Sequence, residues 1–223
     1  MFMNLKLSMK GNIQVKKNKF FIFVLFFVIS VVNLYAENIS FSGGYTRVTM
    51  QNDISMVELS GGAKVSTPTI TIDADTITLS GEGYTNVRCS GNVILNDTSR
   101  GLSVKTVNLY YNRTDETVIS DGWIEIEDTQ NEAKLSGGWF EFNKESSSMT
   151  LQMHASIEKN TDSGLLSCKA DSVNYNSDKQ TLELKGNAAV TWGDSTYNAS
   201  FIKVNIETKE ISLQGSISGE ING

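Results

Sequence analysis

Few residues in this chain have side chains suited to covalent or acid–base catalysis. His154 is the only histidine, so a Ser-His-Asp or Cys-His arrangement would have to use it. It stands where corresponding segments of the chain place glycine, which favours a structural role. Cys89 and Cys168 are the only cysteines and lie in alternating runs on the expected apolar side. We predict two small buried thiols, with a disulfide as the alternative if the chain is exported.

Two pairs of carboxylates have a spacing that a glycosidase or lyase could use. Asp73 and Asp75, and likewise Glu125 and Glu127, are two residues apart and would share one face of a strand. The same spacing arises on the solvent face of any alternating strand. The Asp73-x-Asp75 step also lacks the glycine-rich nonapeptide of calcium β-rolls. We therefore predict no catalytic residue, no metal and no cofactor, with a polysaccharide-cleaving β-solenoid as a remote alternative.

A unit of about 30 residues repeats through the chain and must position whatever site exists. A glycine precedes an alternating apolar run in five copies, and His154 fills the same slot in a sixth. A second anchor, Ala74-Asp75 or Ala170-Asp171, precedes two of these glycines by 16 or 17 residues. Such periods indicate units that bury their apolar faces by stacking on their neighbours. The slots are Gly62, Gly91, Gly122, His154, Gly186 and Gly215.

Each unit reads as two β-strands joined by polar turns. Apolar and polar residues alternate with period two, for example in residues 69–72, 139–142 and 203–206, whereas a helix would place apolar residues at i, i+3 and i+4. Short polar segments such as 112–115 and 176–179 have the composition of tight turns. With a single proline, little interrupts strand pairing. We predict one all-β domain over residues 37–223.

The N-terminus has the pattern of a secretory signal peptide. Lys16, Lys17 and Lys19 precede the apolar run Phe20–Val32, and Ala36 ends a plausible cleavage site. We predict a signal peptide over residues 1–36 and export to the periplasm. If this segment were retained, it would anchor the protein in the membrane.

The charge balance excludes a nucleic-acid partner. The first 36 residues hold five lysines and no acidic residue, so the remaining chain has 14 basic and 25 acidic residues, a net charge of about −11. Proteins that bind nucleic acid through its phosphates need a basic surface. Adhesion to an anionic membrane surface is disfavoured for the same reason.

The repeats resemble a known family. The order Ala-Asp, alternating strand, polar turn, second strand and Gly-Asn is clearest over residues 170–190 and recurs over residues 74–93. This pattern is similar to the OstA-like repeats of the LptA family of periplasmic lipopolysaccharide-transport proteins, and weaker copies cover residues 40–219. The resemblance implies an open, twisted β-jelly roll, a β-taco, in which two facing β-sheets hold lipid acyl chains between them.

The resemblance also implies a set of groove residues. Inward apolar side chains would form one trough in which each buried methylene of a lipid contributes roughly 0.8 kcal/mol. Inward residues of a β-solenoid more often form a packed core without a ligand, so the sequence alone leaves groove and core open. The predicted lipid-binding residues are Ile77, Leu79, Val93, Leu95, Val107, Leu109, Phe140, Phe142, Val173, Tyr175, Leu182, Leu184, Val204 and Leu213.

Partners are implied in the same way. The first mature segment, residues 39–50, and the last, residues 210–221, alternate like strands and carry no proline, so each could add to another sheet. The family's scheme implies head-to-tail homo-oligomers, an inner-membrane LptC-like anchor and an outer-membrane LptD-like translocon. The cargo would be lipopolysaccharide or another envelope glycolipid, carried from the inner to the outer membrane. The alternatives are a membrane-anchored LptC-like protein and a secreted, adhesin-like structural β-solenoid without lipid.

Overall fold

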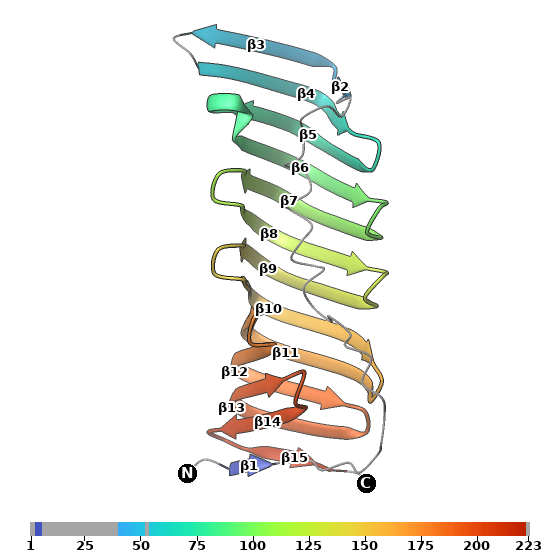
Figure 1. The fold of residues 1–223 in the computed structure, drawn as a ribbon, viewed down its shortest axis with the longest axis vertical. Coiled ribbons are helices and arrows are strands. Elements are labelled where there is room, and N and C mark those ends of the chain that lie inside the picture. The colour runs from blue at the N-terminus through green and yellow to red at the C-terminus, as the bar shows by residue number, and fades with distance from the viewer. Residues whose placement is uncertain (1–2, 6–39, 52–53, 222–223) are drawn as a thin grey trace.

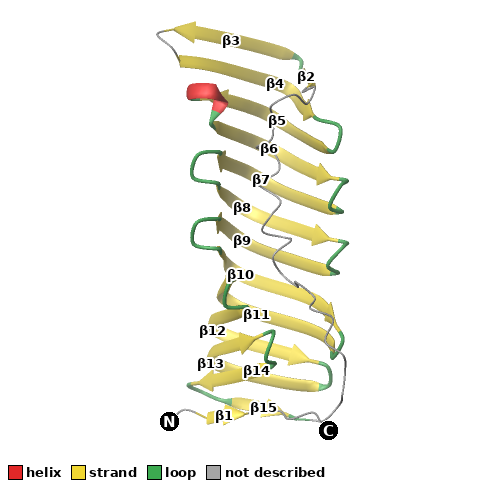
Figure 2. Ribbon diagram, in the orientation of Figure 1, coloured by secondary structure: helices red, strands yellow, loops and turns green. Residues whose placement is uncertain are grey.

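The computed structural model describes residues 3–5, 40–51 and 54–221. Within them every element is a strand except the short 3₁₀ turn η2 (Glu82–Tyr84) (Figure 2). Most of the predicted signal peptide lies outside the described residues. The strands are β1 (Met3–Leu5), β2 (Ser40–Ser42), β3 (Tyr45–Gln51), β4 (Ile54–Ser66), β5 (Ile70–Ser80), β6 (Asn86–Asp97), β7 (Leu102–Asn112), β8 (Thr117–Asp128), β9 (Ala133–Asn143), β10 (Ser148–Thr161), β11 (Gly164–Asn176), β12 (Thr181–Trp192), β13 (Ser195–Asn205), β14 (Glu210–Gln214) and β15 (Ser218–Glu220).

The strands form one long antiparallel sheet in which β4 to β14 pair with their neighbours in the chain (Figure 1). Beyond this run, β2 and β3 both pair with β4 at one end, while β1 pairs with β14 and β15 with β13 at the other. The two ends of the strand order do not pair with each other in the described part of the chain, so the sheet stays open. The predicted all-β, open jelly-roll architecture, with two strands in each repeat, is confirmed.

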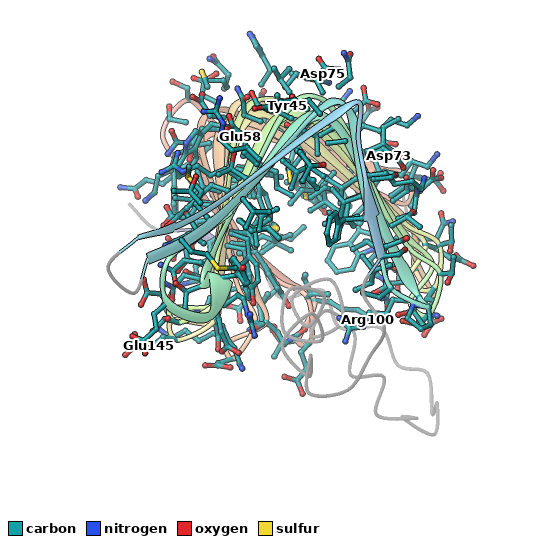
Figure 3. The ribbon with its side chains drawn as sticks, turned by 90° about the horizontal axis from the view of Figure 1, so that it is seen from above. Tyr45, Glu58, Asp73, Asp75, Arg100 and Glu145 are labelled. Atoms are coloured by element: carbon teal, nitrogen blue, oxygen red, sulfur yellow. The ribbon has the colours of Figure 1, made fainter. Side chains whose placement is uncertain are left out.

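Seen from above, the sheet is folded over along its length into an arch (Figure 3). Asp75 lies at the crest, Asp73 on one limb and Glu58 on the other, and Arg100 lies at the open side. We call one side of the arch limb A. It carries Arg100 and the turns after β4, β6, β8, β10 and β12. The other side, limb B, carries Glu145 and the turns after β5, β7, β9, β11 and β13. Every long strand therefore runs from one limb to the other across the crest.

The crest is built from β-bulges in the even-numbered strands. On β6, Gly91 and Asn92 face the single residue Val107 of β7, because pairing breaks off at Ser90 and resumes at Val93. Gly91 and Asn92 have φ of 74° and 47°, a left-handed conformation that glycine adopts freely and asparagine tolerates. Bulges of this kind bend a strand and increase its twist. The repeated glycine slot of the sequence is therefore the fold line of the arch.

Asparagine side chains stabilise the turns of limb B. Asn112 Oδ1 accepts hydrogen bonds from the backbone N–H groups of Thr114 at 2.8 Å and Asp115 at 3.0 Å. Equivalent contacts to the residue three positions ahead are made by Asn143, Asn176 and Asn205. These are the Asx turns that the polar segments of the sequence predict.

Candidate functional site

The concave face of the arch is lined with apolar side chains from both limbs. A large cluster of buried residues runs from β6 to β14, and a smaller one spans β4 to β6. Of the predicted groove residues, eleven are buried in these clusters, and Leu79 and Leu109 are partly exposed and pack against them. The residues chosen from their alternation thus share one face, with one exception.

Val107 was wrongly assigned to the concave face. Its side chain is 51% exposed, at the crest opposite the bulge on β8, where a Cβ added to Gly122 would meet it at 3.1 Å. On β7 the inward positions run through Val104 and Thr106 and then resume at Leu109. Consecutive inward residues are two apart elsewhere on the strand but three apart between Thr106 and Leu109. The alternation of inward and outward side chains therefore shifts by one residue at the crest.

The Ala-Asp and Gly-Asn motifs meet at the crest. Asn92 Nδ2 donates to the carboxylate of Asp75 at 3.1 Å, and Asn187 Nδ2 donates to Asp171 Oδ2 at 2.9 Å. A Cβ on the glycine before each asparagine, Gly91 or Gly186, would lie 2.1 or 2.3 Å from the same aspartate Oδ2. Both motifs therefore act structurally, by holding the fold line with a cross-strand polar pair.

The interior is more open at the N-terminal end than at the C-terminal end. In β4 to β7, several inward residues stay partly exposed while they pack against the clusters. In β10 to β13, inward residues such as Cys168, Leu184 and Val204 are fully buried. The partly exposed residues of β4 to β7 are Val65, Ile72, Leu79, Val87 and Leu109, whereas in β10 to β14 only Trp192 packs against the cluster in this way.

A contact across the mouth marks the closed end. Lys209 Nζ, in the turn after β13 on limb B, donates to Ser163 Oγ, in the turn after β10 on limb A, at 2.6 Å. In Figure 1 the strands β11 to β14 cross over one another, whereas β5 to β9 lie in successive rungs. The accumulated twist of the sheet brings the two limbs together at this end. We call β4–β7 the open half and β10–β14 the closed half.

Charged side chains lie at the inner margins of limb A. Asp97 is buried, and its Oδ1 accepts the backbone N–H of Ser99 at 2.9 Å. Its Oδ2 lies 3.8 Å from Nε of Arg100, whose side chain is mostly buried. Four strands along, on β10, buried Lys159 donates to the backbone oxygen of Asn131. Burial lowers the pKa of Lys159, and the neighbouring carboxylate of Asp128 opposes this shift.

On limb B, Tyr111 and Arg113 lie at the end of β7. Tyr111 is 6% exposed, and burial raises its pKa to about 12. Arg113 Nη1 donates to the backbone oxygen of Gly83 at 3.0 Å. Sequence reasoning missed Arg100, Tyr111, Arg113 and Lys159. The signal that it passed over is that Arg100 and Arg113 bracket a single strand, β7.

The two cysteines are free and buried, as predicted. Cys89 lies on β6 in the open half and Cys168 on β11 in the closed half. Burial raises the pKa of each thiol to about 12, so almost no thiolate forms at neutral pH and neither side chain is an activated nucleophile.

His154 and the predicted carboxylate pairs lie on the convex surface. His154 is exposed at the crest with a φ of 62°, as its place in the glycine slot suggests. Asp73 forms an ion pair with Lys64 at 2.8 Å. Glu125 Oε1 accepts a hydrogen bond from Trp123 Nε1 at 3.1 Å. Glu125 and Glu127 line a surface cavity that also contains Glu158 and Lys134, and Glu127 forms an ion pair with Lys134 at 3.0 Å.

Across residues 3–5, 40–51 and 54–221, no three or more His, Cys, Asp or Glu side chains are grouped so that they could hold a metal ion. The same residues contain no helix that is long and apolar enough to span a membrane.

Comparison with known proteins places the chain in a family. A search of curated proteins gave no match. Among solved structures, the chain matches LptH from Pseudomonas aeruginosa, described as the LptA-homologous periplasmic component of the lipopolysaccharide transport device. The match has 10% identity, covers 84% of this chain and 96% of that one, and has a TM-score of 0.32. The family model of the LptA/(LptD N-terminal domain) LPS transport protein matches residues 71–210, which is more than half of the chain. This protein therefore belongs to the LptA/LptD N-terminal domain family of lipopolysaccharide-transport proteins.

Proposed function

We propose that the protein is a periplasmic bridge that binds the acyl chains of lipopolysaccharide, or of a related glycolipid, along the concave face of the arch and carries the lipid from the inner to the outer membrane. The observation that carries the proposal is the continuous apolar interior, which opens between the limbs at one end. Membership of a lipopolysaccharide-transport family supports it.

The open half is where we place the first contact with acyl chains. Val87, Leu109 and Leu79 are apolar, inward and still partly accessible, so a guest chain would cover surface that is now exposed to water. Each buried methylene would contribute roughly 0.8 kcal/mol. Such contacts are non-directional and similar from strand to strand, which suits movement of a lipid along the face.

The fully buried interior of the closed half is packed as a core in this structure. In a bridge protein, lipid would have to separate the limbs there, or the closed half would serve as a rigid base for contact with a partner. The observed packing thus divides the predicted set. Leu79 and Leu109 are proposed as direct lipid contacts, whereas Leu182, Leu184 and Val204 would contact lipid only after the limbs separate.

Both ends of the sheet can extend by strand addition. β3 and β2 lie on the outer side of β4, with Phe41, Tyr45 and Met50 exposed. At the other end, β14 pairs with β1 in the register Met3↔Leu213 to Leu5↔Ile211. The outer edge of β14 therefore accepts an antiparallel segment. We propose that these edges bind the LptC-like anchor, the LptD-like translocon or further copies of the chain.

The test is site-specific photocrosslinking during export in a Gram-negative cell. A photoreactive residue at Leu109 should capture glycolipid, and one at Val107 should not, because these positions lie on the same strand but on opposite faces. Phe140 and Leu184 report on the middle and the closed half. Mass spectrometry of an organic extract of the purified protein should identify the same lipid.

The alternatives give different results. If no lipid co-purifies and crosslinking at Leu109 equals that at Val107, the interior is a dry core and the protein is a structural solenoid. An intact Phe20 in the mature protein, with lipid bound, would identify an anchored LptC-like component.

A further inference from the structure

Two cationic side chains stand at opposite margins of the open half. Arg100 lies in the turn that leads into β7 on limb A, and Arg113 lies directly after β7 on limb B. The strand between them crosses the crest, so the two turns flank the mouth of the arch at one level of the stack. Figure 3 shows Arg100 at the open side. The chain is strongly acidic beyond residue 36, so this placement is not a consequence of an abundance of basic residues.

The margin on limb B also has hydrogen-bond donors without a protein acceptor. Tyr111 Oη and Arg113 Nε are both buried, and the described residues supply no hydrogen-bond partner for either atom. Tyr111 has its pKa raised to about 12 by burial, so its hydroxyl stays protonated and can donate. Buried donors are normally paired, because an unpaired one carries its full desolvation cost. Two such donors two residues apart indicate a place for an acceptor-rich group.

The charge and the geometry favour an anionic acceptor. Arginine is suited to phosphate because its planar guanidinium can donate two parallel hydrogen bonds. On limb A, Asp97 Oδ2 lies 3.8 Å from Arg100 Nε, a separation that is longer than a hydrogen bond, so their contact is electrostatic. Arg100 thus places a cationic side chain at this margin, beside the mouth.

We propose that Arg100, Tyr111 and Arg113 form a site for the phosphorylated headgroup of the lipid whose acyl chains enter the open half. The inference rests on the proposed function and deepens it, because it assigns the polar part of the cargo to named residues. The headgroup lies across the mouth between the limbs, with Tyr111 and Arg113 donating from limb B and Arg100 from limb A. These residues determine specificity for phosphate, and the apolar interior supplies most of the affinity.

The experiment measures equilibrium binding of fluorescent lipopolysaccharide and of the same material dephosphorylated with phosphatase. It uses protein produced from the full sequence. We expect the native protein to bind the phosphorylated form about tenfold more tightly. The double variant Arg100→Gln/Arg113→Gln should lose most of this preference while its affinity for the dephosphorylated form stays the same. Tyr111→Phe should show a smaller loss in the same direction.

Matched controls separate a headgroup site from a general loss of charge or of folding. Arg88→Gln removes a cation from the convex side of β6, where Arg88 lies over the ring of Tyr110 at 4.7 Å, and should leave the preference intact. Tyr110→Phe removes a hydroxyl from the same strand as Tyr111 but from its other face, where it donates to Asn86 Oδ1 at 2.9 Å, and should also leave the preference intact. Thermal unfolding of each variant checks that the fold is retained.

Each outcome decides a different point. If both lipids bind equally and the double variant behaves like the native protein, the headgroup site is wrong while the acyl-binding function stands. If neither lipid binds, the proposed function itself fails and the headgroup site with it. Inorganic phosphate alone is tested as a competitor of the fluorescent lipid. If it displaces the lipid with a Kd on the order of 1 μM, and the double variant abolishes this competition, the site binds free phosphate. That result would overturn the assignment to a lipid headgroup.

Discussion

The open and closed halves of the arch are built from the same repeat but differ in how their interiors pack. Both have the crest pair, Asp75–Asn92 in the open half and Asp171–Asn187 in the closed half. In the open half inward side chains such as Leu109 keep part of their surface exposed, whereas their counterparts in the closed half are fully buried. At the closed end a hydrogen bond from Lys209 to Ser163 joins the margins of the two limbs. The repeat therefore builds the arch, and the twist of the sheet controls how far it opens.

The largest expected effect is on the stability of the closed half. Leu184→Ala should lower the free energy of unfolding by about 2–5 kcal/mol, because the truncation leaves a cavity among fully buried neighbours. Leu109→Ala, at a partly exposed position, should cost about 1 kcal/mol because less surface returns to water. Urea unfolding monitored by tryptophan fluorescence measures both. Equal losses would show that the two interiors are packed alike.

Substitution of the crest glycine should destabilise the protein equally in the open and closed halves. Gly91→Ala and Gly186→Ala each place a Cβ against an aspartate oxygen at a position of positive φ, so each should cost about 2 kcal/mol or more. Gly62→Ala is the control, since its φ is also positive but no atom lies within 4 Å of the added Cβ. It should cost only about 1 kcal/mol. A marked difference between Gly91→Ala and Gly186→Ala would mean that the crest is not the common element of the two halves.

The two cysteines should make the fold sensitive to alkali in both halves. Burial raises the pKa of Cys89 and Cys168 from 9.0 to about 12. Above pH 9 the unfolded thiols lose their protons while the folded ones keep them, so stability falls as pH rises. Each thiol should contribute a loss of about 1.4 kcal/mol per pH unit between these pKa values. Urea unfolding at pH 8 and pH 10 measures the effect.

The matched control for this pH dependence is the double variant Cys89→Ala/Cys168→Ala, which should lose most of it. In the native protein, the rate of reaction with a thiol reagent should differ between the two halves. Cys89, in the open half, should react faster than Cys168. A faster reaction of Cys168 would reverse the assignment of the open and closed ends.

The smallest expected effect on stability is at the contact across the mouth. Lys209→Ala removes one exposed hydrogen bond and should change the free energy of unfolding by less than about 0.5 kcal/mol. It should nevertheless speed thiol labelling of Cys168, because the limbs can separate more easily at the closed end. Lys179→Ala, in the turn after β11 on the same limb, is the control and should leave the labelling rate unchanged. No change with Lys209→Ala would show that the packed interior alone keeps this end closed.

Most of the fold could be predicted because its determinants are local. Alternation located the strands, and Asn112 and Asn176 start turns through contacts with residues two or three positions ahead. The candidate site was only partly predictable. Val107 was misplaced because the inward positions shift by one residue at the crest. Arg113 was overlooked because the sequence does not show that the turns before and after β7 lie at the two margins of one opening.

By itself, the sequence determined the all-β class, the two-strand repeat and the repeated glycine slot with its Gly-Asn step. These depend on backbone preferences and side-chain periodicity within about 30 residues. Only the tertiary structure decided which half is open, which face Val107 occupies at the bulge, and which side chains flank the mouth. Lys209 and Ser163 are 46 residues apart, and they meet because small twists between neighbouring strands accumulate along the sheet.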